Sequence, residues 1–343
     1  MSTTPIRCAV AGVGRMGRHH ARVYAQMPEV EFVGAMDQDA VRRGSIVKEW
    51  GGEAFGSVDA LIDAGIDAVT IATPTTTHRA LAEKFLEAGV HCLIEKPLAP
   101  DSEDAAAITA AAERANRVLQ VGHVVRYDPV MRAVQAIDGV RPRFIEMIRV
   151  SPMTFRSIDV GVVLDMMIHD LDLLMMLVGT EPEEVHANAI SVLGEAEDMC
   201  NARLVFPADC DGIQTVANVT ASRLAFKTER KLRIISEDIY ISADFGDRSG
   251  KIVRKSANQR SLDDVRSQLQ DGEDLSNVDY LSLVNIDSLK IEDEEPLRLQ
   301  AEAFLHAIQH NEVPDVDAEA GAAAVRTAER IVEAARMAGA RMV

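Results

Sequence analysis

A glycine-rich turn between a strand and a helix constrains this chain more than any other feature of its sequence. The apolar run IRCAVAG (6–12) leads directly into GVGRMG (12–17), and helical periodicity covers 15–27. In such a turn the first glycine permits a tight bend, the second admits a pyrophosphate to the backbone, and the third lets helix and strand pack closely. The helix N-terminus adds free N–H groups and a partial positive charge. We therefore predict a dinucleotide site at Gly12, Gly14, Arg15, Met16 and Gly17.

Strand-like and helical segments alternate through the first 123 residues. After the glycine turn they follow one another at 30–37, 39–50, 67–74, 78–89, 90–97, 101–116 and 118–123. Strands that alternate with helices of this length are typical of right-handed βαβ units in a parallel sheet. We therefore expect an α/β fold whose first domain, residues 1–123, is a Rossmann domain with a doubly wound parallel sheet.

The pattern changes after residue 123. A helical segment at 128–138 and a strand-like run at 144–150 precede the apolar helix LDMMIHDLDLLMML (164–177). Further elements follow with little helix among the strands: β-type runs at 185–193, 201–206, 212–222, 231–236 and 239–245, then helices at 297–310 and 317–338. Consecutive strands joined by short turns form antiparallel sheets. The pattern predicts a second, α+β domain over residues 124–343.

Charge limits the partners of the chain. The formal net charge of −18 argues against binding to nucleic acid or to an anionic membrane, although an anionic small ligand needs only a local positive site. Eleven acids fall within 261–296, against Arg266 and Lys290. We interpret this acidic excursion as a solvated segment, with a flap over a substrate site or an oligomer contact as the alternatives.

The N-terminus and the cysteines indicate an ordinary cytoplasmic protein. MSTTPIRCAVAGVG has no charged region followed by an apolar one, so we expect no signal peptide. The four cysteines include no CxxC pair, and Cys8 and Cys92 lie in apolar, strand-like runs. Buried core thiols are the expected result, and no metal site is expected.

Polar residues stand where the predicted strands end. Asp37 follows Gly17 by 20 residues, where an acidic side chain binds the ribose hydroxyls of NAD and repels the 2′-phosphate of NADP. Arg42 and Arg43 could accept that phosphate, but they belong to the next helix. Because ligands bind at the carboxyl ends of parallel strands, further cofactor contacts are expected from Thr73, Pro74, His78, Glu95 and Lys96. For His78, a place on the helix surface is the alternative.

The apolar helix at 164–177 carries four ionisable groups. With α-helical spacing, Asp165, His169 and Asp172 fall on one face. A histidine supplies the near-neutral base that removal of a hydroxyl proton requires. Asp170 points elsewhere, and we expect it to pair on the helix surface. The first three side chains could instead ligate a metal ion, but no second histidine stands at ligand spacing.

Five motifs, in this order, resemble the glucose–fructose oxidoreductase/inositol dehydrogenase/MocA family over essentially the whole chain. They are GVGRMG (12–17), ATP (72–74) with His78, IEKP (94–97), GHVVRYDP (122–129) and DMMIHDLD (165–172). The resemblance implies a Rossmann domain followed by a domain on an open, mostly antiparallel sheet, which often forms the contact of a homo-oligomer. It implies that a sugar or cyclitol CH–OH is oxidised to a ketone with NAD(P), or the reverse.

The resemblance also implies roles for single residues. Lys96 hydrogen-bonds the reacting oxygen, His169 is the general base, and Asp165 supports the arrangement. Glu95 shapes the turn that presents Lys96. Within GHVVRYDP, substrate contacts are implied for Arg126 and Tyr127.

Within the family, the chain most resembles the UDP-N-acetylglucosamine 3-dehydrogenases, over 17–37, 120–129, 141–149, 155–174 and 218–245. This implies NAD-dependent oxidation of the sugar 3-hydroxyl, before a transaminase acts on the ketone on a route to an amino-substituted lipid A sugar. Two alternatives stay open: a dehydrogenase of another sugar or cyclitol such as myo-inositol, and a non-catalytic, nucleotide-binding regulator of the same fold.

A nucleotide-sugar substrate carries a diphosphate, which requires arginine or lysine. The basic candidates are Arg149, Arg156, Arg223 and the run Lys227–Arg233. We favour Arg156 and Arg223, because the run is typical of a solvated strand edge. Asp172 is expected in the wall of the substrate site.

Overall fold

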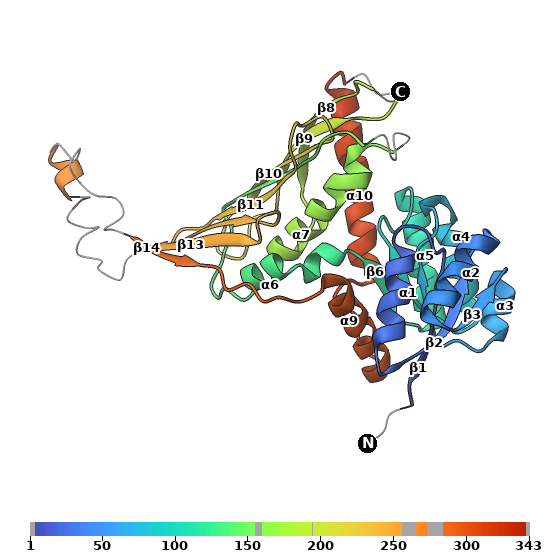
Figure 1. Ribbon diagram of the computed structural model, residues 1–343. Helices are drawn as coiled ribbons and strands as arrows, with labels where there is room; N and C mark the ends of the chain where they lie inside the picture. The colour runs from blue at the N-terminus through green and yellow to red at the C-terminus, as the bar shows by residue number, and fades with distance from the viewer. Residues whose placement is uncertain are drawn as a thin grey trace.

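The computed structural model describes residues 4–154, 160–193, 195–255, 265, 267–272 and 284–340 (Figure 1). It contains a six-stranded sheet and an eight-stranded sheet. The first is parallel throughout, and the second is antiparallel except for one pair of strands. The predicted fold class is therefore confirmed.

The six-stranded sheet has the order β3-β2-β1-β4-β5-β6. Its strands are β1 (Ile6–Ala11), β2 (Val30–Met36), β3 (Glu53–Phe55), β4 (Ala68–Ile71), β5 (His91–Glu95) and β6 (Leu119–Gly122). The helices between them are α1 (Gly17–Gln26), α2 (Ala40–Trp50), α3 (Val58–Asp63), α4 (His78–Glu87) and α5 (Ser102–Ala115). The chain reverses its direction of winding between β1 and β4, which creates the crevice where ligands of such sheets bind.

The eight-stranded sheet has the order β14-β13-β12-β11-β7-β10-β9-β8. Its strands are β7 (Phe144–Val150), β8 (Glu184–Ile190), β9 (Met199–Val205), β10 (Val216–Ser222), β11 (Glu229–Ile235), β12 (Ile239–Asp244), β13 (Ser249–Lys255) and β14 (Val284–Ser288). β11 pairs with both β7 and β12. The prediction that the run Lys227–Arg233 is a sheet edge was therefore wrong, because most of that run is an interior strand.

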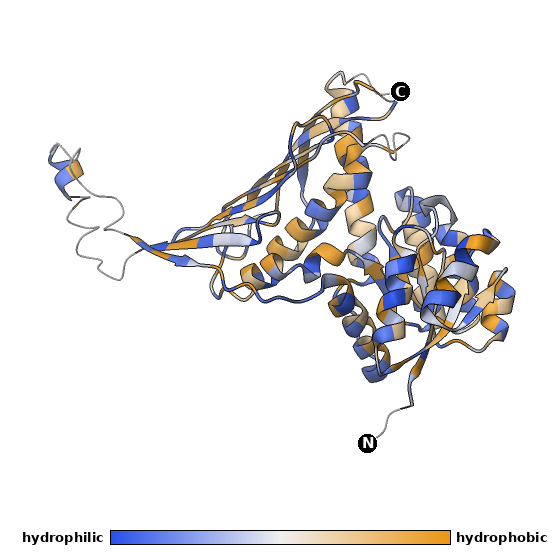
Figure 2. Cartoon of the chain, viewed as in Figure 1, coloured by the Kyte–Doolittle hydropathy of each residue, from blue (hydrophilic) through white to orange (hydrophobic). Residues whose placement is uncertain are grey.

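Helices cover one face of the large sheet. They include α6 (Pro129–Gln135), the π-helix η3 (Val163–Met167) and α7 (Ile168–Val178), and Figure 2 shows α7 as a largely hydrophobic segment. The strands β7 and β10 alternate buried and half-buried residues, as expected for a sheet with one covered face.

The two C-terminal helices join the two sheets. α9 (Pro296–His310) buries Leu297 and Phe304 in the same core as β1 and α1. α10 (Ala318–Met337) packs Val325 against the core of the first sheet and Ile331 against the core of the second. These contacts hold the sheets in a fixed relation (Figure 1). The boundary between 1–123 and 124–343 stays a prediction.

The predicted acidic excursion, 261–296, is only partly described, because 261–264, 266 and 273–283 lie outside the described residues. Its last part is mostly exposed, as expected of a solvated segment, and it is also held to the rest of the fold. Residues 284–288 form the edge strand β14, and Asp293, Glu294 and Glu295 form ion pairs with Arg248, Arg132 and Arg22. No helix in the described part of the chain is long and apolar enough to cross a membrane.

Candidate active site

The glycine turn has the shape that a dinucleotide requires. Gly12 has φ +84°, and a Cβ there would lie 2.7 Å from Thr73 Cγ2. A Cβ at Gly17 would lie 1.8 Å from the Gly12 carbonyl oxygen. Gly14, in contrast, has nothing within 4 Å of its Cβ position. The turn is closed on its packing side and open at its second glycine, so it fits a pyrophosphate. Of the two predicted neighbours, Arg15 is exposed and Met16 packs on the core.

Asp37 lies directly after β2 and faces this turn. Its Oδ2 accepts a hydrogen bond from Val13 N at 2.9 Å, and its Oδ1 accepts one from Asp39 N at 2.9 Å. Arg43 Nη1 donates to the Asp37 carbonyl at 2.9 Å. The carboxylate therefore stands beside the glycine turn, as the ribose-binding prediction requires, with one arginine close to it.

The loops after β4 and β5 are tied together by His78. The strand predicted at 67–74 ends at Ile71, so Thr73 and Pro74 belong to the loop. His78 is 1% exposed, and its ring nitrogens lie 3.0 Å from the Thr73 carbonyl and 3.1 Å from the Pro97 carbonyl. The alternative of a surface position for His78 was therefore wrong. Burial lowers the pKa of His78.

Glu95 and Lys96, at the end of β5, point to different partners. Glu95 Oε1 lies 2.7 Å from Nε2 of His20 on α1, and both side chains are buried. This contact fixes the end of β5 against the helix that begins at the glycine turn. A cis peptide bond links Lys96 to Pro97. The Glu95 contact is consistent with the turn-shaping role that the family resemblance implied.

Lys96 and Asp165 lie in direct contact. Lys96 Nζ donates to the Asp165 carbonyl at 2.6 Å and stands 3.5 Å from Asp165 Oδ1. Burial lowers the pKa of Lys96, and the charges of Asp165 and Glu95 oppose that shift. Asp165 belongs to the π-helix η3, in which Ile168 N donates to the Val163 carbonyl. The expectation of α-helical spacing was therefore wrong between Asp165 and His169, and it holds from His169 to Asp172 within α7.

His169, in the first turn of α7, is half-buried next to a second histidine. Its Nδ1 is buried without a hydrogen-bond partner among the described residues. The rings of His169 and His123 meet edge to face, with centroids 6.2 Å apart. Burial lowers the pKa of His169 well below its usual value, and the charges of Lys96, Arg149, His123 and Arg230 lower it further. The imidazole is therefore neutral near pH 7, as a general base must be.

His123 is the functional candidate that the sequence analysis missed. It follows β6, is 1% exposed, and neither of its ring nitrogens has a hydrogen-bond partner among the described residues. Its Nδ1 stands 3.9 Å from Asp172 Oδ2. The signal was present, since His123 ends the fifth predicted strand of a parallel sheet and so must reach the ligand-binding edge.

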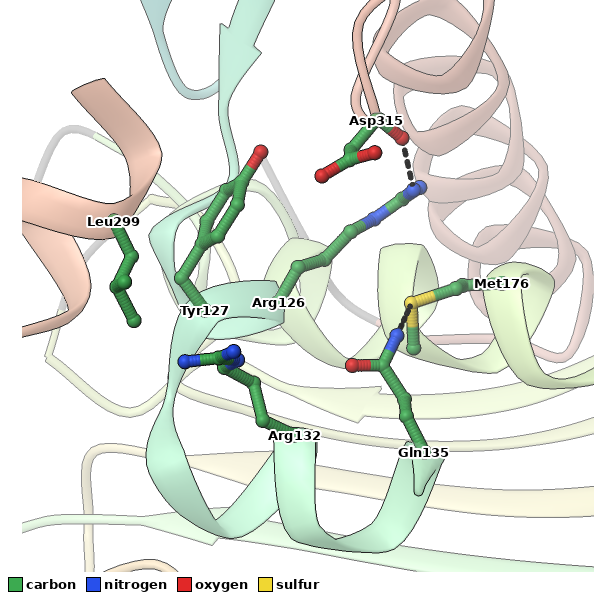
Figure 3. A pocket seen from close by; sticks show the side chains of 7 residues that line it. All are labelled: Arg126, Tyr127, Arg132, Gln135, Met176, Leu299 and Asp315. Atoms are coloured by element: carbon green, nitrogen blue, oxygen red, sulfur yellow. Dashed lines mark hydrogen bonds between the residues drawn. The ribbon is translucent and has the colours of Figure 1, made fainter. Parts of the chain in front are cut away.

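Asp172 is buried and engaged by Arg126. Arg126 donates from Nε at 2.8 Å and from Nη2 at 2.6 Å to the two carboxylate oxygens, and from Nη1 to the Asp315 carbonyl at 2.7 Å. Arg126 and Tyr127 line a cavity of about 400 Å³ with Arg132, Gln135, Met176, Leu299 and Asp315 (Figure 3). Lys96, Asp165 and His169 do not line it. The link from Arg126 to His169 runs through Asp172 and His123.

Asp170 forms a buried ion pair. Arg149 donates to it from Nε at 3.0 Å and from Nη2 at 2.6 Å, and the two residues are 2% and 7% exposed. Asp170 therefore pairs as expected, but the expected place on the helix surface was wrong, because β7 lies against this side of α7.

The two favoured diphosphate ligands are not seen at the site. Arg156 lies outside the described residues. Arg223 is buried, and it donates to Asp198 Oδ1 at 2.6 Å and to the Val160 carbonyl at 2.9 Å. It supports the segment before η3, and its predicted contact with substrate stays a prediction.

The start of η3 is held by Glu197. Val163 N donates to Glu197 Oε1 at 3.1 Å, and Val162 N donates to the Glu197 carbonyl at 3.0 Å. Gly161 lies against the same carboxylate, because a Cβ there would stand 2.0 Å from Oε1. No group of three or more His, Cys, Asp and Glu side chains within the described ranges is placed to hold a metal ion.

A dinucleotide turn, a partly buried lysine and a neutral histidine at one sheet edge define an NAD-dependent dehydrogenase that acts on CH–OH groups. The chain matches the oxidoreductase family with an NAD-binding Rossmann fold over residues 6–123, and the GFO/IDH/MocA C-terminal domain over residues 149–241. The chain belongs to the GFO/IDH/MocA family.

Named relatives fall within this class. UDP-N-acetylglucosamine 3-dehydrogenase of Acidithiobacillus ferrooxidans is 41% identical over 240 residues, which are 70% of this chain and 74% of that protein. A solved structure of that enzyme has a TM-score of 0.85 at 34% identity and covers 98% of this chain and 99% of its own. Inositol 2-dehydrogenase of Rhizobium meliloti is 33% identical over 200 residues, which are 56% of this chain and 60% of that protein.

Proposed function

We propose that the chain oxidises the 3-hydroxyl of UDP-N-acetylglucosamine to a ketone with NAD. The observation that carries the proposal is the contact of Lys96 Nζ with Asp165, at the start of the helix that holds the neutral His169. The choice of substrate is supported by the 41% identity to an enzyme named for that reaction.

In this mechanism His169 takes the hydroxyl proton while the hydrogen on the same carbon leaves as hydride. Lys96 donates a hydrogen bond to the reacting oxygen, which stabilises the negative charge that develops there. Asp165 holds Lys96 in place through its carbonyl. NAD, when its pyrophosphate is held at the glycine turn, would supply the hydride acceptor. Asp37 holds the ribose hydroxyls, and its charge disfavours a 2′-phosphate.

The same proposal includes the cellular setting. We place the enzyme in the cytoplasm, where NAD and nucleotide sugars are available. The 3-keto product suits a transaminase, on a route to an amino-substituted lipid A sugar. The outer face of the large sheet is the proposed contact of a homo-oligomer.

A substrate panel tests the proposal. Purified protein is mixed with NAD and, in turn, UDP-N-acetylglucosamine, N-acetylglucosamine, myo-inositol and glucose, and NADH is followed by its absorbance. NADH formation with the nucleotide sugar alone is the expected result. Turnover of myo-inositol without turnover of the nucleotide sugar would favour the inositol alternative that the Rhizobium meliloti relative suggests. No turnover with any candidate would favour a regulator.

Two variants test the mechanism. His169→Ala and Lys96→Ala are each expected to lower turnover by roughly 100-fold or more, with little change in NAD affinity. Near-normal turnover in His169→Ala would remove it as the base. Arg298→Gln is the control for handling of variants, since Arg298 is exposed on α9 and pairs with Glu302 at 2.8 Å.

A further inference from the structure

Two arginines stand side by side on the large sheet, next to the proposed base. Arg230 of β11 and Arg149 of β7 are direct partners in the antiparallel register. Arg230 has the same strand parity as Leu232 and Ile234, which are buried in the core that α7 completes. Because side chains alternate along a strand, Arg230 points to the α7 side of the sheet. The charges of both arginines reach His169, since both contribute to its lowered pKa.

The two arginines differ in how their charge is balanced. The Asp170 carboxylate accepts hydrogen bonds from Nε and Nη2 of Arg149. Arg149 Nη1 has no hydrogen bond among the described residues. Arg230 is exposed, and within the described ranges its guanidinium has neither a hydrogen bond nor an ion pair. Partial burial and the neighbouring charge of Arg149 lower the pKa of Arg230, and the charges of Asp170 and Asp128 oppose that shift. Two neighbouring positive charges repel each other. Binding of an anion between or above them is therefore favoured.

The other arginines near the site have their charge satisfied inside the protein. Arg126 is bound by Asp172 and by the Asp315 carbonyl, and Arg223 is bound by Asp198 and by the Val160 carbonyl. Neither can turn to a ligand without breaking its ion pair with a buried carboxylate. Arg230 breaks no such contact when it binds a ligand.

We propose that Arg230, backed by Arg149, is the subsite for the diphosphate of a nucleoside diphosphate sugar; this rests on the proposed function for the identity of the sugar. The geometry of the substrate agrees. In such a sugar the diphosphate is on C1, and a single ring carbon separates C1 from C3. A base at the 3-hydroxyl and a diphosphate subsite must therefore lie within one sugar ring of each other. A guanidinium binds phosphate oxygens in a bidentate way, which fixes the ring against the base.

The test compares Arg230→Gln with Arg298→Gln. Both residues are exposed, but Arg298 lies on α9, which packs on the core of the first sheet, and it pairs with Glu302 at 2.8 Å. Arg230→Gln is expected to raise KM for UDP-N-acetylglucosamine by about 10- to 100-fold and to change kcat much less, because a charge-assisted hydrogen bond to the substrate is lost. Arg230→Lys should recover part of the loss, and Arg298→Gln should match the wild type.

A second measurement separates this subsite from the identity of the sugar. UDP binding is measured by calorimetry with NADH saturating, so that the cofactor site is closed to UDP. If the wild type does not oxidise UDP-N-acetylglucosamine but Arg230→Gln still weakens UDP binding, the proposed substrate is wrong and the subsite stands. Equal UDP affinity in the wild type and Arg230→Gln, or no UDP binding by either, overturns the subsite.

Discussion

Gly161 and Glu197 form a contact whose energy can be measured by a double-mutant cycle. In Gly161→Ala the new Cβ would stand 2.0 Å from Glu197 Oε1 and 2.2 Å from Glu197 Cδ. The obstacle is the end of a flexible side chain, so the carboxylate moves and the backbone stays. Val163 N then loses its 3.1 Å hydrogen bond. Because Val163 is fully buried, this unsatisfied N–H costs about 1–3 kcal/mol.

Glu197→Ala removes the same hydrogen bond by another route and should cost about the same, roughly 1–3 kcal/mol. In the double variant the bond is lost only once, and the alanine methyl at 161 enters space that the carboxylate has left. The two costs therefore should not add. We expect a coupling energy of about 1–3 kcal/mol, which makes the double variant more stable than the sum of the single effects predicts.

Urea unfolding followed by circular dichroism and by Trp50 fluorescence measures these free energies, provided that both probes give one transition and the m-value is unchanged. Gly44→Ala is the matched control, because Gly44 lies in α2 and has nothing within 4 Å of its Cβ position. The changes in unfolding free energy caused by Gly44→Ala and Glu197→Ala should add to within about 0.5 kcal/mol. If Gly161→Ala and Glu197→Ala add equally well, Glu197 does not hold the start of η3.

Three further predictions concern the site. Burial and nearby cations lower the pKa of His169, so its neutral form persists below pH 6.5. The value of kcat/KM for oxidation should therefore stay level through neutral pH and fall only in acid. An acid limb above pH 7 would contradict this prediction. Asp37→Ala should weaken NAD binding by about 10- to 100-fold and relax the discrimination against NADP, and an unchanged preference in fluorescence titrations would exclude Asp37 as the ribose ligand. His123→Phe should keep turnover within a few-fold, because it keeps a ring against His169. His123→Ala should lower kcat by about tenfold at constant KM. An equal loss of kcat in both variants would mean that the ring nitrogens of His123 are needed.

Features that depend on local sequence could be predicted well. The glycine turn, the alternation of strands and helices, and the strand 144–150 are visible because a buried strand requires a short apolar run and a tight turn requires glycine. The strand β13 was not predicted. Its sequence, SGKIVRK, has little apolar alternation, and it gains its conformation from the strands beside it.

Features that depend on long-range contacts could not be predicted. The π-helical turn at Asp165 lies between a contact to Glu197, 34 residues from Val163, and a contact to Lys96, 69 residues from Asp165. Asp170 was expected at the surface because its partner, Arg149, belongs to a strand whose position the helix pattern does not contain. The burial of His78 could likewise not be predicted, since its three carbonyl partners come from loops that meet only in the folded sheet.

The cations around His169 couple substrate binding to the strength of the base. In the free enzyme, Lys96, Arg149 and Arg230 lower the pKa of His169, which keeps it neutral but makes it a weak base. A diphosphate on Arg230 would offset part of that positive charge, so the pKa of His169 should rise when the anionic substrate binds. The acid limb of kcat, which reports the substrate complex, should therefore lie at higher pH than the acid limb of kcat/KM, which reports the free enzyme. In Arg230→Gln the acid limb of kcat/KM should move to higher pH, because one of the cations that lower the pKa of His169 is absent. If the acid limbs of kcat and kcat/KM coincide in the wild type, the substrate does not offset the positive charge around His169.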